Sequence, residues 1–282
     1  MAKPKVFVIY YSTYGHVHTL SQSLVKGALK PGTVDVELYQ IAETLSEDTL
    51  EKMHAAPKAN VPEITADKLA DADGILLGFP TRFGTAPAQV KALFDATGKL
   101  WASKALQGKS VGMFFSTGSQ HGGQESTAYT FLPHLAHHGM IYVPLGYPSA
   151  HMFDNDTIVG GSAWGSGVIA GPDGSLQPTY KELEIAEIQG EKFAQVVTKL
   201  AAGSEQKDNA EKQQSAAKAS ENVAAADSQN PAASAPAQLA KPAADSAPQA
   251  DASAAAAGTS AAAKEKGGTM RKLVAKFKKA FK

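Results

Sequence analysis

The sequence predicts a doubly wound α/β fold, in which helices cover both faces of a five-stranded parallel sheet. Short runs of β-branched and aromatic residues alternate with helical patterns along the first 145 residues. Most of these runs are apolar throughout, which is typical of strands that are buried on both faces. Of the 21 aromatic residues, only Phe277 and Phe281 lie beyond residue 201, so we expect the folded domain to end there.

The first strand is expected at 5–11, between Pro4 and a polar turn, and the helix after it at 16–29. Residues 34–40 alternate apolar and polar side chains, which predicts an edge strand. The last helix begins at the capping box formed by Thr179 and Glu182. Between them we expect strands at 73–79, 110–116 and 140–145, helices beginning at Pro87 and spanning 124–138, and a glycine-rich loop at 146–177.

Five strand–helix units in about 200 residues fit the flavodoxin-like arrangement, with strand order 2-1-3-4-5. We therefore predict one ligand-binding domain at 1–201. Residues 202–263 are rich in Ala, Pro and Ser and are expected to form a disordered linker, because they bury too little apolar surface to offset the entropy of ordering. Residues 264–282 form a short basic segment.

The formal net charge of zero conceals an uneven distribution. Residues 264–282 carry +7, so the rest of the chain carries −7, which argues against general nucleic-acid binding by the domain. The absence of cysteine excludes disulfides, thiolate metal sites and cysteine-linked lipids. The longest apolar run of the first strand is too short to span a membrane, and we expect a cytoplasmic protein.

Residues 270–282 have the pattern of an amphipathic helix, with Met270, Leu273, Val274, Phe277 and Phe281 on one side and six cations on the other. Thirteen helical residues span only about 20 Å, which is short of a hydrocarbon core of ~30 Å. This pattern favours reversible attachment to an anionic membrane surface, such as the inner face of the plasma membrane. Docking on an acidic partner, or on the chain's own acidic domain, remains the alternative.

Three turn-rich segments follow the first, third and fourth predicted strands, at 12–17, 80–85 and 116–124. Ligands of open parallel sheets bind at the carboxyl ends of the strands, so these segments are expected to lie together. The glycine and hydroxyl residues at 12–17 precede a helix, whose N-terminus can bind a phosphate without lysine. Residues 12–17 contain neither a Walker-A nor a dinucleotide-binding glycine pattern, and ordinary surface turns are the alternative interpretation.

Six ordered motifs within residues 3–200 resemble the WrbA family of FMN-dependent NAD(P)H:quinone oxidoreductases, whose fold is flavodoxin-like. The matching stretches are Tyr10-Tyr11-Ser12-x-Tyr14-Gly15-His16, Pro80-Thr81-Arg82-Phe83-Gly84, Leu100-Trp101-Ala102-Ser103, Ser116-Thr117-Gly118, Gly122-Gly123-Gln124-Glu125 and Leu135-Ala136-His137-His138-Gly139-Met140. With its tail after residue 201, the chain looks similar to fungal members of the family that carry a tail.

The resemblance implies non-covalently bound FMN, with NAD(P)H as electron donor, and assigns the chemistry to the flavin rather than to a catalytic side chain. It implies Tyr14 as the NAD(P)H contact, Trp101 as the quinone contact, and His137 as a residue that completes the site against a second subunit of a homodimer or homotetramer. The implied FMN residues are Ser12, Thr13, Tyr14, Gly15, His16 and Val17 at the phosphate, Thr81, Arg82 and Phe83 with Pro80 and Gly84 at the isoalloxazine edge, and Ser116, Thr117, Gly118, Ser119, Gln120 and His121 at the flavin and ribityl chain.

The function that follows is two-electron reduction of quinones by NAD(P)H, with a role in protection against oxidative stress. Two alternatives stay open: a flavodoxin-type carrier of single electrons, and a membrane-associated flavoprotein without catalytic activity. A zinc site is disfavoured, because His134 and His138 share a helix face but no third ligand stands at zinc spacing.

Overall fold

The computed structural model describes residues 2–227, with the backbone alone from residue 205 onward. The chain divides into two units, Met1–Ser228 and Gln229–Lys282. The expected basic segment at 264–282 and residues 228–263 of the expected linker lie outside the described residues.

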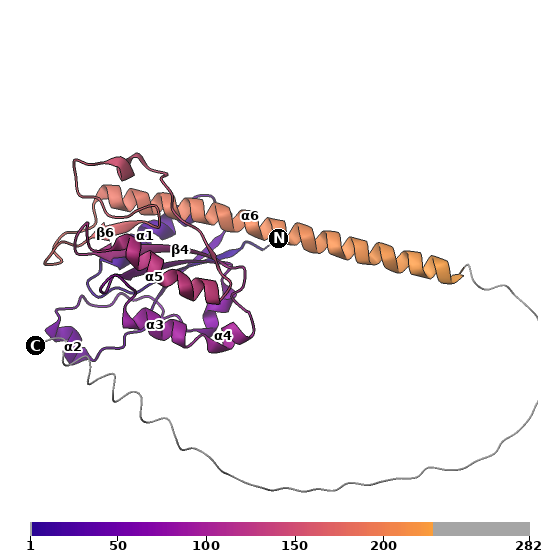
Figure 1. The fold of residues 1–282 in the computed structure, drawn as a ribbon, viewed down its shortest axis with the longest axis horizontal. Helices are drawn as coiled ribbons and strands as arrows, with labels where there is room; N and C mark the ends of the chain where they lie inside the picture. The colour runs from indigo at the N-terminus through magenta and orange to yellow at the C-terminus, as the bar shows by residue number, and fades with distance from the viewer. Residues whose placement is uncertain (1, 228–282) are drawn as a thin grey trace, which may run out of the picture. The chain divides into compact units, whose positions relative to one another are not determined.

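The described part of the chain alternates strands and helices, as the sequence predicts (Figure 1). The strands are β1 (Lys5–Tyr10), β2 (Asp35–Gln40), β3 (Gly74–Pro80), β4 (Ser110–Thr117), β5 (Ile141–Tyr142) and β6 (Gly167–Ile169). The α-helices are α1 (His16–Leu29), α2 (Glu47–Lys52), α3 (Ala88–Asp95), α4 (Gly98–Ala102), α5 (Gln124–His137) and α6 (Tyr180–Asp227), with short 3₁₀ helices at η1 (Asp67–Asp71) and η2 (Ala150–Phe153).

All strand pairs are parallel, and the order β2-β1-β3-β4-β5 confirms the predicted topology. β1 lies between β2 and β3, with Val6 opposite Val36 on one side and Gly74 on the other. The order reverses at β1, so the turns after β1 and β3 leave the same edge of the sheet from neighbouring strands.

The pairing of β4 on the side away from β3 differs from the expectation. The strand predicted at 140–145 is reduced to β5, which pairs only with Ser110 and Val111. Pro144 has no N–H to continue the ladder, and the chain turns at Gly146, where φ is 67°. The carboxyl half of β4 pairs instead with β6, which lies inside the region expected to be a loop. The chain after β6 is thereby brought to the same edge as the turn after β4.

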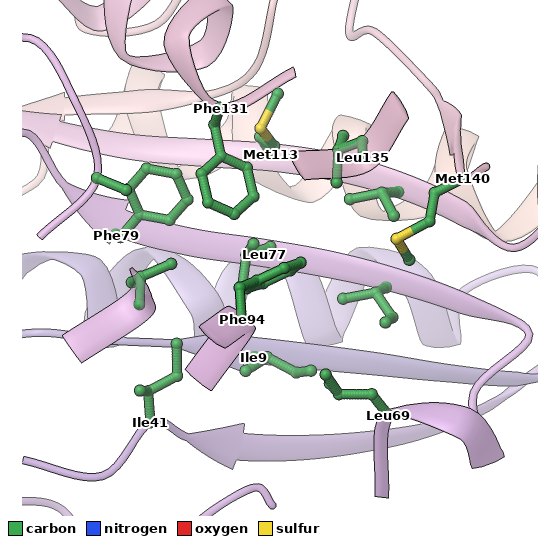
Figure 2. Packing of buried hydrophobic residues seen from close by; sticks show 14 of the residues in the cluster. Ile9, Ile41, Leu69, Leu77, Phe79, Phe94, Met113, Phe131, Leu135 and Met140 are labelled. Carbon is green, nitrogen blue, oxygen red and sulfur yellow. The ribbon is translucent and has the colours of Figure 1, made fainter. Parts of the chain in front are cut away.

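Side chains of β1 alternate between two apolar layers. Val6 and Val8 face the layer formed with α1 and α6, where Leu20 and Phe193 are fully buried or nearly so. Ile9 faces the opposite layer with α3, α4 and α5, in which Phe94 packs against Phe131 (Figure 2). The two layers exclude water from both faces of the sheet, so ligand access is left to its edges.

The last helix confirms the capping box and continues past the expected domain boundary. Thr179 N–H and its hydroxyl donate to Glu182 Oε2 at 2.7 and 2.9 Å, and the Glu182 N–H donates back to Thr179 Oγ1 at 3.3 Å.

α6 then extends to Asp227, so residues 202–227 are helical rather than without regular structure. This stretch is rich in Ala, Lys, Glu and Gln and has no Gly or Pro between Gly203 and Pro231, which favours a helix.

Candidate functional site

A cleft of about 570 Å³ lies at the carboxyl edge of the sheet, over the ends of β1, β3 and β4. The three segments predicted to meet there do meet. Their residues in the wall are Ser12, Thr13, Tyr14, His16, Val17, Pro80, Thr81, Arg82, Ser116, Thr117 and Gly118. Gly15 belongs to the first of these turns and sets its shape.

The turn at 12–17 presents unpaired main-chain donors. Gly15 adopts a left-handed conformation with φ of 89°, and its N–H donates to Ser12 Oγ at 3.0 Å. The first N–H groups of α1, at His16 and Val17, have no acceptor among the described residues, as the geometry of a helix start requires. These donors, together with the positive end of the helix dipole, form an anion-binding site.

The three threonine hydroxyls in the cleft wall donate their hydrogens within the protein. Thr13 Oγ1 donates to Tyr11 Oη at 3.3 Å, and Thr117 Oγ1 donates to Ser119 O at 2.8 Å. Thr81 Oγ1 lies 2.6 Å from Thr127 Oγ1, whose own hydrogen goes to Gly123 O, so Thr81 is the donor of that pair. The hydroxyl hydrogens that remain available to a ligand are therefore those of Ser12 and Ser116, not those of the threonines.

The segment after β3 forms a tight two-residue turn. Arg82 and Thr85 exchange backbone hydrogen bonds at 2.8 and 3.2 Å, and both central residues are left-handed, Phe83 with φ of 55° and Gly84 with φ of 78°. The Phe83 ring is fully exposed, at 105% of its reference surface, and stands outside the cleft wall. A large aromatic residue in this conformation is strained by about 1–2 kcal/mol, which is typical of positions kept for function.

Few backbone N–H groups of this turn are available to a ligand. The N–H of Thr81 donates to Ser116 O, that of Arg82 to Thr85 O, and that of Gly84 to Thr81 Oγ1. Only the Phe83 N–H has no acceptor within the described part of the chain. The Arg82 guanidinium supplies the remaining donors and the positive charge of this wall.

The rest of the third predicted segment turns away from the cleft. Gln120 and His121 line a separate hollow of about 380 Å³ with Val159–Ser162, and Ser119 does not line the cleft. The buried Gln124 side chain ties this region together, because its Nε2 donates to Thr117 Oγ1 at 3.0 Å and its Oε1 accepts from Gly161 N–H.

Trp101 and His137 also lie outside the cleft of their own chain. Trp101 stands on α4 with 60% of its surface exposed. His137 is exposed at the end of α5, where it lines a hollow of about 200 Å³ with His134 and His138. Burial, together with the two neighbouring histidines, lowers the pKa of His138, whose Nε2 lies 2.8 Å from Thr97 Oγ1. Among the side chains that the structure describes, which end at residue 204, no three His, Asp or Glu residues gather as a metal-binding group.

Two wall segments were not predicted from the sequence. Met53, His54 and Ala56 follow α2, and the Ala56 N–H donates to Thr13 O at 2.9 Å. Residues 170–174 follow β6 and are held by His16, whose ring Nε2 lies 2.9 Å from Leu176 O. The turn-forming sequence Gly171-Pro172-Asp173-Gly174 signals a turn, but nothing in the sequence indicates which strand it would follow.

Comparison with known proteins identifies relatives of the chain. Residues 4–155 match the family described as NADPH-dependent FMN reductase. The quinone-oxidoreductase QR2 of Triphysaria versicolor is 55% identical over 197 residues, which is 70% of this chain and 96% of that protein. The NAD(P)H quinone oxidoreductase YCP4 of Candida albicans is 46% identical over 214 residues, covering 75% of this chain and 74% of that protein.

Among solved structures, a flavodoxin-like, WrbA-like protein from Agrobacterium tumefaciens has 25% sequence identity and a TM-score of 0.49. The match covers 70% of this chain and 99% of that one. In the part of the chain that the structure describes, no helix is both long enough and apolar enough to span a bilayer.

Proposed function

Because the chain belongs to the family of NADPH-dependent FMN reductases, we propose that it reduces quinones with electrons from NAD(P)H, using FMN held in the cleft at the carboxyl edge of the sheet. Its relatives at about half sequence identity carry the name quinone oxidoreductase and align with this chain over most of their length. The observation that carries the proposal is the set of unpaired N–H groups at the start of α1, which lies in the same cleft as Arg82.

The cleft fits this cofactor in size and in donor chemistry. Its volume of about 570 Å³ lies within the range of ligand pockets, ~300–1,000 Å³. The N–H groups of His16 and Val17 and the hydroxyl of Ser12 suit a phosphate dianion, which accepts hydrogen bonds only. The Phe83 N–H and the Arg82 guanidinium suit the carbonyl edge of a heteroaromatic ring. Gly118, at the end of β4, has no side chain to obstruct a ligand.

When bound, FMN would supply the chemistry of two-electron transfer between NAD(P)H and the quinone. The protein binds and orients the reactants and provides electrostatic stabilisation. The Arg82 guanidinium would hold positive charge beside the bound ring, and Tyr14, which is 46% exposed at the cleft wall, would contact NAD(P)H. In this proposal every residue of the site belongs to the domain at 1–201.

We further propose that a second copy of the chain completes each site, in a homodimer or homotetramer. Trp101 and His137, the expected quinone and flavin contacts, do not reach the cleft of their own chain. Trp101, Tyr129 and Tyr147 are each at least 60% exposed, and large exposed aromatic side chains are favoured in protein interfaces.

Residues 270–282 would bring a cytoplasmic enzyme to an anionic membrane surface, on the strength of their amphipathic pattern. Co-sedimentation with phosphatidylserine vesicles tests this. The full chain should pellet with the vesicles, and a chain ending at residue 265 should not. Equal pelleting of the two would contradict membrane binding by this segment.

The test of the redox function is spectroscopic and kinetic. Purified protein incubated with FMN and desalted should retain a flavin absorption spectrum, which NADPH should bleach and benzoquinone restore. Steady-state oxidation of NADPH should then depend on benzoquinone. A folded sample that keeps no flavin after desalting would contradict the proposal, as would a flavin-loaded sample that does not oxidise NADPH.

A further inference from the structure

A chain of hydrogen bonds leaves the cleft at Arg82 and ends outside it at a carboxylate. Arg82 Nη2 donates to Thr13 Oγ1 at 3.1 Å, and Thr13 Oγ1 donates to Tyr11 Oη at 3.3 Å. The Tyr11 hydroxyl donates in turn to Glu43 Oε2 at 3.0 Å. Four residues from three separate parts of the chain are thus joined in one series.

The two ends of the series fix the direction of every hydrogen bond in it. A guanidinium can only donate, and an ionised carboxylate can only accept. Thr13 and Tyr11 must therefore both donate toward Glu43, and neither hydroxyl can rotate without losing a bond. Their exposed fractions are 4% and 3%, so water does not readily replace a lost partner.

Glu43 and Tyr11 keep the protonation states that this direction needs. Burial acts to raise the pKa of Glu43, but hydrogen bonds from Gln89, from the N–H groups of Leu45 and Thr44 and from Tyr11 hold that pKa below its ordinary value. Burial raises the pKa of Tyr11 to about 12, with the Glu43 carboxylate acting in the same direction. At neutral pH the carboxyl is ionised and the phenol is protonated.

Arg82 has little else to hold it. Its other hydrogen bond runs from Nη1 to the carbonyl of its neighbour Thr81, at 2.9 Å. Among the described residues Arg82 forms no salt bridge, although it lines the cleft. The hydroxyl of Thr13 is thus the fixed point that sets the direction of the guanidinium.

We propose that Thr13 and Glu43 are positioning residues, which hold the Arg82 guanidinium toward the cofactor through the Tyr11 hydroxyl. The inference rests on the proposed function, because FMN is the group that Arg82 would meet. It assigns a role in the site to Glu43, which does not line the cleft, and gives Thr13 a role distinct from donating to the phosphate.

Two substitutions interrupt the series at different places. Thr13→Val removes the hydroxyl at nearly constant volume, and Thr13→Ser restores it. In the unaltered protein, three groups donate to Glu43 Oε1, namely Gln89 Nε2 and the N–H groups of Thr44 and Leu45. In Glu43→Gln we expect the amide oxygen to occupy this position, because the amide NH₂ cannot accept these hydrogen bonds. The amide NH₂ then faces Tyr11 and reverses the direction of the phenol hydrogen, so that the Thr13 hydroxyl hydrogen loses its acceptor at Tyr11 Oη.

The experiment measures FMN dissociation constants and the midpoint potential of bound FMN for each variant, after quinone turnover has been confirmed for the unaltered full chain. We expect Thr13→Val and Glu43→Gln to weaken FMN binding by about three- to tenfold and to lower the midpoint potential, and Thr13→Ser to restore both. Glu47→Gln, on an exposed carboxylate of α2, is the matched control and should change neither.

A double-mutant cycle with Arg82→Met separates positioning from general damage. If Thr13 and Glu43 act through Arg82, their substitutions should have no further effect on FMN affinity once Arg82 is removed. Additive effects would overturn the proposal, as would unchanged FMN affinity in Arg82→Met. Neither result would contradict the proposed function, as long as the unaltered chain binds FMN and turns over quinone. If the unaltered chain does neither, the proposed function and the positioning role are both wrong. Thermal unfolding of the FMN-free variants shows whether Thr13→Val has merely failed to fold, and Glu43→Gln then carries the test.

Discussion

Glu182 fixes the position of β6 and of the loop before it, which lead into residues 170–174 of the cleft wall. Its side chain is 1% exposed, and its Oε1 accepts from the N–H groups of Gly160 and Ile169 at 2.9 and 3.0 Å while its Oε2 caps α6. One carboxylate thereby joins the start of a helix to both sides of the loop that contains β6. Residues 170–174, which face the cleft, begin immediately after Ile169.

Glu182→Gln should destabilise the protein by about 2–4 kcal/mol, because an amide has one acceptor oxygen where four donors require two, and the donors that its NH₂ faces lose their acceptor. The free energy of unfolding in urea measures this loss. Glu184→Gln, on the exposed side of the same helix, should change the free energy of unfolding by less than about 0.5 kcal/mol. A similar small change in Glu182→Gln would show that the buried carboxylate is not required.

At the level of single residues, the sequence predicts backbone roles better than side-chain roles. The left-handed Gly15 and the helix start after it follow from a local pattern, and both are observed. The hydroxyls of Thr13, Thr81 and Thr117 could not be assigned from the sequence. Thr81 bonds to Thr127, far along the chain, and the other two bond to residues two positions away in turns whose geometry only the folded chain sets. The sequence therefore predicts which segments reach the cleft, but not which of their donors remain available to a ligand.

Helices α1 and α6 approach each other closely through two glycines. A Cβ on Gly27 would stand 1.8 Å from Glu187 O, and one on Gly190 would stand 2.2 Å from Leu24 O. Both obstacles are backbone atoms of the facing helix, so neither can move aside as a flexible side chain would. The pair lets the helices pack nearly backbone to backbone on one face of the sheet.

Gly27→Ala and Gly190→Ala should each destabilise the protein by about 3 kcal/mol, since α1 and α6 must separate to admit the methyl group. Gly203→Ala on the same α6 is the control, because its Cβ would meet nothing within 4 Å and the change should stabilise the helix by about 0.5–1 kcal/mol. Thermal and urea unfolding of the three variants measure the difference. Equal effects at all three positions would contradict the close approach.

The loop between β5 and β6 is tied to α6 by an ion pair between Asp154 and Lys181. Hydrogen bonds from Lys181, then from Thr157 and the N–H of Asp156, lower the pKa of Asp154. A lowered carboxyl pKa contributes stability above the unfolded value of about 3.9, and that contribution is lost as the pH falls through the folded value. Asp154→Asn should therefore be less stable than the unaltered protein at about pH 6, with the gap narrowing toward about pH 3. A gap independent of pH would contradict the ion pair.

Elements with strong local patterns were predicted to within a residue or two, and elements that depend on their partners were not. β1, α1 and α5 follow from apolar periodicity and from glycine or proline at their ends. β6 has three residues, and only pairing with Phe115–Thr117 makes it a strand. The helix at 202–227 was missed because a lack of large apolar residues was interpreted as a lack of structure, whereas helix propensity alone favours this conformation.

At the scale of the whole molecule, the cleft combines turns at 12–17, 53–56, 80–82, 116–118 and 170–174. The topology of a parallel sheet predicts the first, third and fourth, because they follow strands at the point where strand order reverses. The other two belong to excursions without apolar periodicity, whose position only the folded chain reveals. Trp101 and His137 stand apart from all five segments, which bears on how many copies of the chain make one site.

If a second copy supplies His137, then two inactive variants should restore activity when they are mixed. Ser12→Asp places a negative charge among the phosphate donors and disables the cleft, and His137→Ala removes the expected contribution from the other subunit. In a mixed dimer, one site combines both defects and the other has neither. Random exchange of subunits between equal amounts of the two variants should therefore recover about one quarter of the unaltered quinone reductase activity. The rate is measured before and after subunit exchange, with each variant alone as the reference. A mixture that stays at the average of its two components would show that each chain completes its own cleft.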